Sequence, residues 1–144
     1  MFTAQATPAD LSALVRIDSC VIGNDSRKSQ LANYIRNNQC VLGSVHGEPA
    51  GFACYDTSFF GCCFIQLVIV SPDFRRQGVA RALIQYIIDH CPTGKLFTST
   101  NASNSAMQQV CFSMGFIPSG IIENLDEGDP EWVYFIETSN GAVL

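Results

Sequence analysis

The sequence predicts a mixed α/β fold with about seven strands and about four helices. Two observations support this prediction. The 144 residues are 47% hydrophobic and 15% charged, which is typical of one compact domain with a substantial core. Segments with helical and with strand-like apolar spacing alternate along the chain, and no repeat or Pro-, Gly- or Ser-rich linker interrupts them. We therefore expect a single domain over residues 1–144, with a frayed tail at 138–144.

The N-terminal region predicts a strand followed by two helices. A short strand over residues 2–6 precedes Thr7, a typical N-cap because a proline and then an acid follow it in the first turn. Ser26 predicts the N-cap of a second helix, which residues 37–38 end. Residues 21–25 are expected to form the loop between the two helices.

Three strands are predicted next. Residues 40–45 and 50–55 form a hairpin, because the segment between them contains the Gly and Pro that turns require. Residues 62–70 are apolar except for Gln66 and predict a central strand that is covered on both faces.

The second half predicts two helices and three strands. An apolar stripe at helical spacing predicts the first helix, which Pro92 and Gly94 end. Gly115 ends the second helix, where a left-handed residue is favoured. The predicted ranges are a helix at 76–91, a strand at 95–99, a helix at 104–114, and strands at 116–122 and 131–137.

Charge and cysteine content exclude several classes of protein. The net charge of −5 argues against a nucleic-acid partner, which requires a basic face, and suits a cationic substrate better. No segment has the run of apolar residues that a membrane span needs. The seven cysteines are odd in number and contain no Cys-x-x-Cys pair, so we expect no disulfide framework, no metal and a reducing cytoplasm.

The corner between the central strand and the next helix predicts a phosphate site. A strand that turns into a helix exposes unpaired N–H groups, with the positive end of the helix dipole behind them. Gly78 leaves room for an anion, Ala80 adds little bulk, and Arg75 and Arg76 supply positive charge. The alternative is a solvated loop in which Gly78 only relaxes the turn. No dinucleotide or Walker glycine pattern is present.

These residues resemble a known family. Arg75-x-x-Gly78-x-Ala80, directly after an apolar strand, resembles the acetyl-CoA motif (Gln/Arg)-x-x-Gly-x-(Gly/Ala) of the GNAT superfamily of acyl-CoA-dependent N-acyltransferases. The helix headed by Asn104 and ending in Gly115-Phe116 is similar to that family's next block. The resemblance covers essentially the whole chain. It implies a GNAT-like, mostly antiparallel central sheet and acetyl-CoA as acyl donor.

The resemblance also implies which residues hold the cofactor. The backbone of the central strand would bind the pantetheine arm, and an amide at Ile69 or Val70 would donate to the thioester carbonyl. The alternatives are ordinary core packing for these aliphatic residues and a helix N-cap for Asn104. The implied cofactor-binding residues are Val68, Ile69, Val70, Arg75, Arg76, Gln77, Gly78, Val79, Ala80 and Asn104.

Two positions depart from the catalytic pattern of that family. Where members often have a tyrosine acid, this chain has Cys111, which either protonates the departing thiolate or fills the core. Where members often have a glutamate base on the central strand, this chain has Gln66, which can orient a water but cannot take its proton. The candidate catalytic residues are therefore Val70, Cys111 and Gln66, and the remaining candidates for the base are Asp25, Asp56, Glu123 and Glu131.

We expect an N-acetyltransferase that transfers acetyl directly to a primary amine of a small molecule or peptide, in a ternary complex. The alternative is a non-catalytic acyl-CoA-binding sensor or scaffold. The acceptor depends on the loops predicted at 21–25, 56–61 and 123–130, and the acidic residues of the last loop either attract a cationic amine or form a solvated turn. The apolar pair Phe59-Phe60 offers a contact for a homodimer, or is an ordinary exposed pair.

Overall fold

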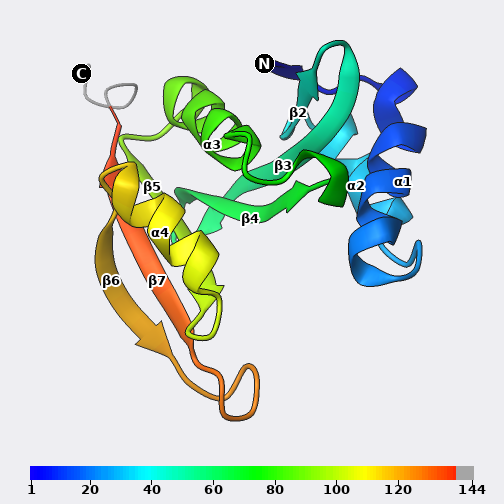
Figure 1. Ribbon diagram of the computed structural model, residues 1–144. Helices are drawn as coiled ribbons and strands as arrows, with labels where there is room; N and C mark the ends of the chain where they lie inside the picture. The colour runs from blue at the N-terminus through cyan, green and yellow to red at the C-terminus, as the bar shows by residue number, and fades with distance from the viewer. Residues whose placement is uncertain (139–144) are drawn as a thin grey trace. The chain divides into compact units, whose positions relative to one another are not determined.

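One sheet of seven strands and four α-helices make up the described part of the chain, residues 1–138, in the computed structural model (Figure 1). The strand order in the sheet is β1-β2-β3-β4-β5-β7-β6. β4 pairs with β5 in parallel, whereas β1–β2, β2–β3, β5–β7 and β6–β7 are antiparallel. The predicted mixed, mostly antiparallel fold is therefore confirmed.

The elements follow the predicted order, with two short 3₁₀ turns added. No helix among residues 1–138 has the length and apolar character needed to cross a membrane. The bounds are β1 Phe2–Gln5, η1 Pro8–Asp10, α1 Leu11–Ile22, α2 Lys28–Arg36, β2 Cys40–Val45, β3 Glu48–Phe59, β4 Cys62–Val70, η2 Pro72–Phe74, α3 Val79–His90, β5 Lys95–Asn101, α4 Ser105–Ser113, β6 Ile117–Ile122 and β7 Glu131–Glu137.

The chain forms two compact units. Unit 1 consists of Met1–Tyr55 and Leu67–Ile88, and unit 2 consists of Asp56–Gln66 and the chain from Asp89 onward. The strands β3 and β4 contribute residues to both units. Each unit is described by itself below.

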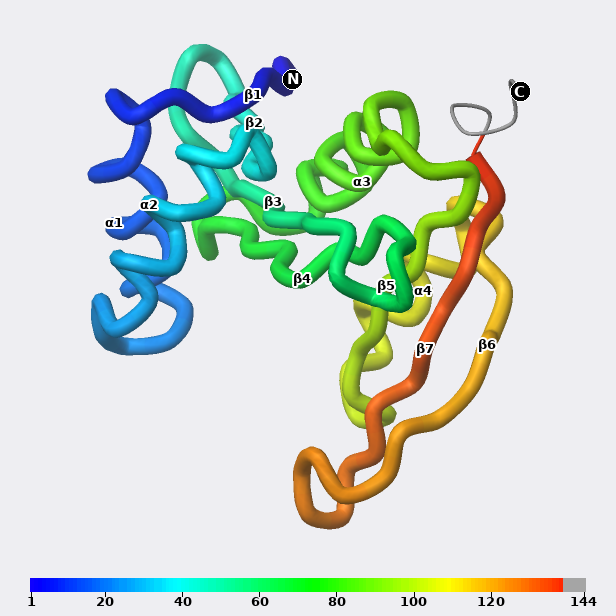
Figure 2. Tube along the Cα trace, turned by 180° about the vertical axis from the view of Figure 1, so that it is seen from behind, coloured from blue at the N-terminus to red at the C-terminus, as the bar shows by residue number. Residues whose placement is uncertain are grey.

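In unit 1, the helices α1 and α2 lie next to each other and bury their apolar sides (Figure 2). Leu14 of α1, Leu31 of α2 and Phe52 of β3 have no exposed surface. The stripe on α3 is buried as predicted, at Val79, Leu83, Ile84 and Ile87. Apolar burial of this kind contributes about 2 kcal/mol per large side chain, so these helices are held by packing more than by local preference.

Gly51 of β3 has no room for a side chain. A Cβ at this position would lie 2.7 Å from the carbonyl oxygen of Ile69 in β4 and 2.9 Å from Cγ1 of Val79 in α3. The sequence analysis gave Gly51 no role, because a glycine inside a strand shows no sign of what lies opposite it.

Several predicted element ends were wrong. α1 continues through Val21 to Ile22 and ends at Gly23, whose φ is +86°, so the predicted loop at 21–25 is shorter. Ser26 does not cap α2, because Arg27 precedes its first residue and pairs with the buried Asp18. The predicted helix start at Arg76 is also too early: Arg76 is left-handed, and α3 begins at Val79.

The segment at 56–61 is not a loop. β3 runs to Phe59, and only Phe60 and Gly61 connect it to β4; their φ angles of +53° and +76° define a tight two-residue hairpin turn. The expectation that β4 is covered on both faces was wrong as well. Gln66 is exposed, and residues 67–70 are only half-buried.

In unit 2, α4 lies beside β7, where the buried Cys111 neighbours the buried Tyr134. Thr138, the first residue of the predicted frayed tail, is also buried there, and its hydroxyl donates to the carbonyl oxygen of Thr93 at 2.6 Å. Thr138 is therefore not frayed, and residues 139–144 lie outside the described part of the chain.

The contact at Gly51 predicts a large effect for Gly51→Ala. The added methyl group meets backbone and must displace β4 or α3, so the free energy of unfolding should fall by about 1–3 kcal/mol. Gly43→Ala is the matched control, because its Cβ would lie 3.3 Å from the flexible end of Leu83. Urea denaturation of both variants measures the difference, and equal losses would contradict this account.

Candidate active site

The loop at 71–78 connects β4 to α3 in unit 1. It is anchored at its start, where the amide of Ser71 donates to the carbonyl of Ala50 at 2.8 Å and the amide of Phe74 donates to that of Ser71 at 2.9 Å. From Arg75 to Gly78 the residues are exposed. The two arginines therefore lie at the surface, as predicted.

The second half of this loop contains two left-handed residues, Arg76 with φ +63° and Gly78 with φ +80°. A Cβ on Gly78 would have no other atom within 4 Å, so the space over this backbone is open to solvent. Left-handed residues turn successive N–H groups toward one side, which is the geometry of an anion nest. The loop thus fits a phosphate group in both conformation and accessibility.

The first turn of α3 adds N–H groups to this nest. The amide of Ala82 donates to the carbonyl of Gly78 at 3.0 Å, so the amides of Gly78, Val79 and Ala80 precede the first intrahelical bond. The positive end of the helix dipole lies at the same place. A diphosphate would find main-chain donors here without a lysine.

The end of β4 carries the three aliphatic residues assigned to the pantetheine arm, Val68, Ile69 and Val70. All three are half-buried, and Ile69 also packs against the apolar core of unit 1. Ile69 therefore has the packing role that was the alternative, and the backbone of all three residues continues directly into the loop at 71–78.

In unit 2, the side chain of Gln66 on β4 is hydrogen-bonded to a carboxylate. Its Nε2 donates to both carboxylate oxygens of Asp56 on β3, at 3.3 and 3.4 Å. The amide and hydroxyl of Ser58 also donate to Oδ1 of Asp56, at 3.1 and 2.7 Å. The exposed Gln66 is thus paired with a half-buried carboxylate, which the sequence could not show because the two residues lie on different strands.

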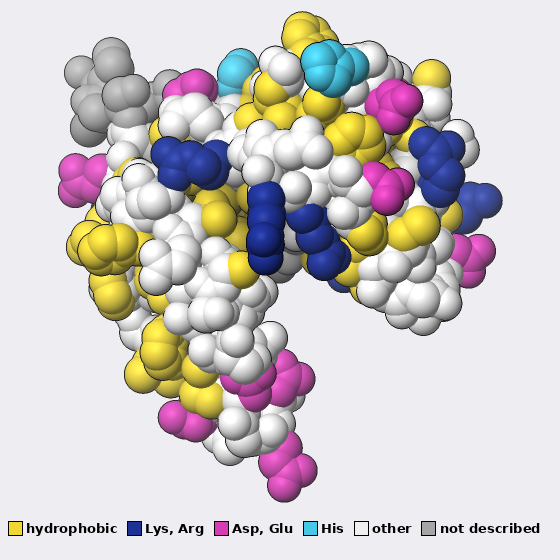
Figure 3. Space-filling model, in the orientation of Figure 1, with side chains coloured by type: hydrophobic (Ala, Val, Ile, Leu, Met, Phe, Trp, Pro, Cys, Tyr) yellow, Lys and Arg dark blue, Asp and Glu magenta, His cyan; other side chains and the backbone are white. Residues whose placement is uncertain are grey.

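The other candidate acids have different surroundings. Glu131 begins β7 and accepts a hydrogen bond from the hydroxyl of Ser99 at 2.7 Å. Asp126 and Asp129 of the β6–β7 loop are bonded to Asn101 and Ser103. Figure 3 shows acidic side chains gathered at the end of this hairpin. The loop is therefore both held in place and strongly negative.

Cys111 on α4 is fully buried, and burial raises the pKa of its thiol to about 11. Its electrostatic neighbour is Tyr134 of β7, whose pKa is raised by its own burial and then by Cys111. The sequence analysis missed Tyr134 because nothing in the chain order places β7 beside α4. Full burial favours the packing role of Cys111 over the acid role.

Asn104 caps α4, because its side-chain oxygen accepts the amide of Met107 at 3.1 Å. This is the structural role that was predicted as the alternative. Within residues 1–138, no three His, Cys, Asp or Glu side chains gather in a way that could hold a metal ion.

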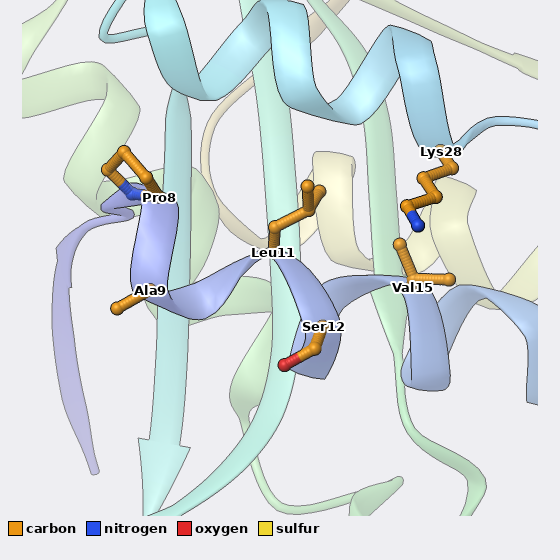
Figure 4. A pocket seen from close by; sticks show the side chains of 6 residues that line it. All are labelled: Pro8, Ala9, Leu11, Ser12, Val15 and Lys28. Atoms are coloured by element: carbon orange, nitrogen blue, oxygen red, sulfur yellow. The ribbon is translucent and has the colours of Figure 1, made fainter.

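A pocket of about 370 Å³ in unit 1 was not expected (Figure 4). It lies between the start of α1 and α2, away from the loop at 71–78, and its lining is mostly apolar. The one charged side chain in its wall is Lys28, so the pocket does not suit a cationic amine. The lining residues are Pro8, Ala9, Leu11, Ser12, Val15 and Lys28.

The chain belongs to the acetyltransferase (GNAT) family, whose model matches residues 13–116. Members of this family are acyl-CoA-dependent N-acetyltransferases, and this chain is an enzyme of that class. The resemblance stated from the two motifs is thereby confirmed.

Three solved structures illustrate the relationship. A GNAT-family acetyltransferase from Bacillus cereus is 47% identical, with a TM-score of 0.93 over 95% of this chain and 96% of that chain. The ribosomal-protein-S18-alanine N-acetyltransferase from Escherichia coli has 21% identity and a TM-score of 0.82 over 99% and 97% of the two chains. The yncA protein from Salmonella typhimurium, solved with acetyl-CoA, has 20% identity and a TM-score of 0.79 over 99% and 96%. The last two share the fold. No curated protein matches the chain.

The nest at Gly78 predicts that Gly78→Ala weakens CoA binding. The methyl group strains a left-handed residue and covers the amides, so the dissociation constant of CoA should rise by about tenfold or more. Gly47→Ala is the matched control, because Gly47 has the same φ of +80° and equally open surroundings in the β2–β3 turn. Isothermal titration calorimetry compares the two, and equal CoA affinities would exclude this loop as the binding site.

Proposed function

We propose that this protein transfers acetyl from acetyl-CoA directly to a primary amine of a small molecule or peptide, in a ternary complex. The observation that carries the proposal is the exposed, left-handed loop ending at Gly78, whose free space and main-chain donors fit a diphosphate. When bound, acetyl-CoA supplies the thioester whose acetyl group is transferred. Within unit 1, the amides at 77–80 would hold the diphosphate, with Arg75 and Arg76 beside it.

The backbone of Val68, Ile69 and Val70 is proposed to bind the pantetheine arm. An amide at Ile69 or Val70 would donate to the thioester carbonyl oxygen and stabilise the negative charge that develops there during attack. This assigns the catalytic role of Val70 to its main chain and leaves its side chain to pack.

Asp56 is our candidate for the general base. An amine with an ordinary pKa of about 10.4 must lose a proton before it can attack, and a carboxylate is required to accept that proton. Gln66 donates to Asp56 and is itself exposed, so it can orient a water that passes the proton to the carboxylate. Glu131, held by Ser99, is the alternative acceptor of that proton.

The uneven distribution of charged residues between the two units supports a cationic amine as the acetyl acceptor. Unit 2 holds eight of the chain's 13 acidic residues but only one of its eight basic residues, Lys95. Unit 1, which includes the loop at 71–78, therefore has an excess of basic residues. The excess of acidic residues in unit 2 favours a cationic amine as the acceptor.

We also propose that the protein works in a reducing compartment such as the cytoplasm. All seven cysteines are free thiols. Cys54 donates its S–H to Cys40 on the neighbouring strand, with the sulfurs 3.8 Å apart in a fully buried contact. Such pairs persist as thiols where the surroundings are reducing.

The function is tested by measuring CoA thiol release with a panel of amines. We expect release that depends on the amine and is fastest with cationic amines, together with acetylated product by mass spectrometry. Tight CoA binding with only slow hydrolysis would instead support the alternative of a non-catalytic acyl-CoA sensor.

Asp56→Asn should lower kcat by about 10²–10⁴-fold, because the amide cannot accept the proton from the amine. The dissociation constant of CoA should not change. Glu48→Gln is the control, since Glu48 is an exposed acid at the start of β3. Steady-state kinetics with the best amine measures the effect, and a normal kcat for Asp56→Asn would shift the role to Glu131.

Cys111→Ala should leave kcat close to that of the wild type. The free energy of unfolding should fall by about 1 kcal/mol, because the substitution removes a fully buried side chain. Kinetics and thermal unfolding of the same preparation separate the two effects. A large loss of kcat at unchanged stability would restore Cys111 as the acid.

A further inference from the structure

The pocket between the start of α1 and α2 in unit 1 has an apolar wall that continues the core. We call it the α1–α2 pocket. Leu11 and Val15, which lie one helical turn apart on α1, line it and are only half-buried, although both also pack against the apolar core of unit 1. Pro8 and Ala9, both exposed, add apolar surface to its wall. An apolar chain in this pocket would therefore extend the core and cover side chains that water now reaches.

Lys28, the first residue of α2, places a positive charge in the same wall. Figure 4 shows its side chain directed from α2 back over Val15. Within residues 1–138, its ammonium group has no carboxylate within 4.0 Å and no hydrogen-bond partner. The adjacent Arg27 is different, because it is paired with the buried Asp18. The α1–α2 pocket thus combines an apolar wall with a cation that lacks a partner in this part of the chain.

We propose that the α1–α2 pocket binds a small amphiphilic monoanion, an apolar chain that ends in a carboxylate. The chain would lie against Leu11 and Val15, and the carboxylate would lie beside the ammonium group of Lys28. One ammonium group matches one negative charge, whereas a phosphate dianion would need further donors. A volume of about 370 Å³ holds about a dozen non-hydrogen atoms at roughly 30 Å³ each, which is the size of a medium-chain fatty carboxylate.

The surroundings of the pocket favour an anion. Asp10, the acid nearest in sequence to the lining residues of α1, does not line the pocket, and its carboxylate accepts the amide and the hydroxyl of Thr7 at 2.8 and 3.2 Å. Because Lys28 begins α2, the positive end of the helix dipole adds to its charge. The site proposed for acetyl-CoA is a different one, in the loop at 71–78. Binding in the α1–α2 pocket therefore requires neither acetyl-CoA nor turnover.

The proposal is tested with sodium octanoate as the probe, followed by methyl NMR of the full chain. We expect saturable shifts of the methyl groups of Leu11 and Val15, and smaller shifts with octanol and octylamine, which lack the negative charge. Leu125, which is 63% exposed in unit 2, serves as the internal reference for non-specific association. Shifts at Leu125 as large as those at Leu11 and Val15, or no saturation at Leu11 and Val15, would overturn the proposal.

Lys28→Glu should reverse the preference of the pocket. The dissociation constant of octanoate should rise by about tenfold, because an attraction becomes a repulsion, and octylamine should then bind more tightly than octanoate. Lys28 is exposed, so the circular dichroism of the variant should match that of the wild type.

Lys95→Glu is the matched control, since it makes the same change of charge at an exposed lysine of unit 2 that does not line the pocket. It should leave the affinity for octanoate unchanged. An equal loss of octanoate affinity in both variants would assign the effect to net charge and overturn the proposed site. A Lys28→Glu variant that still prefers octanoate to octylamine would overturn it as well.

Discussion

The close approach at Gly51 is the constraint on which the cofactor side of this protein depends. The missing side chain lets β3 contact both the carbonyl of Ile69 in β4 and the side chain of Val79 at the start of α3. Next to it, the carbonyl of Ala50 accepts the amide of Ser71. One strand thus holds both ends of the loop at 71–78. Between these anchors Arg76 and Gly78 have left-handed conformations, which turn successive amides toward one side.

The two departures from the family pattern have different physical explanations. A carboxylate is absent from β4, yet Gln66 on that strand holds the carboxylate of Asp56 on the adjacent strand. We propose that the carboxylate needed for proton transfer lies one strand away from its usual place, at Asp56 in unit 2. At position 111 the departure is different, because the thiol lies in the packed interior with its pKa raised by burial. This burial favours a packing role for Cys111.

Backbone strain occurs at the proposed phosphate site and at one turn of unit 2. Arg76 and Phe60 are the two non-glycine residues in 1–138 that have positive φ without belonging to types that favour it. Arg76 lies in the loop at 71–78 of unit 1, and Phe60 lies in the β3–β4 turn of unit 2. Substitution by asparagine or glycine would relieve strain at either site. A bulky residue with a strained positive φ is expected where its side chain contacts another molecule.

The sequence by itself determined the order of the elements, the strand β4 to the residue, the stripe of α3 and the position of the loop between them, because these depend on local periodicity and on glycine and proline chemistry. Only the tertiary structure decided that β3 continues to Phe59 and that Gln66 pairs with Asp56. These features join residues from different strands. Their contacts depend on register and on which face each side chain occupies, and neither can be read from spacing along one segment.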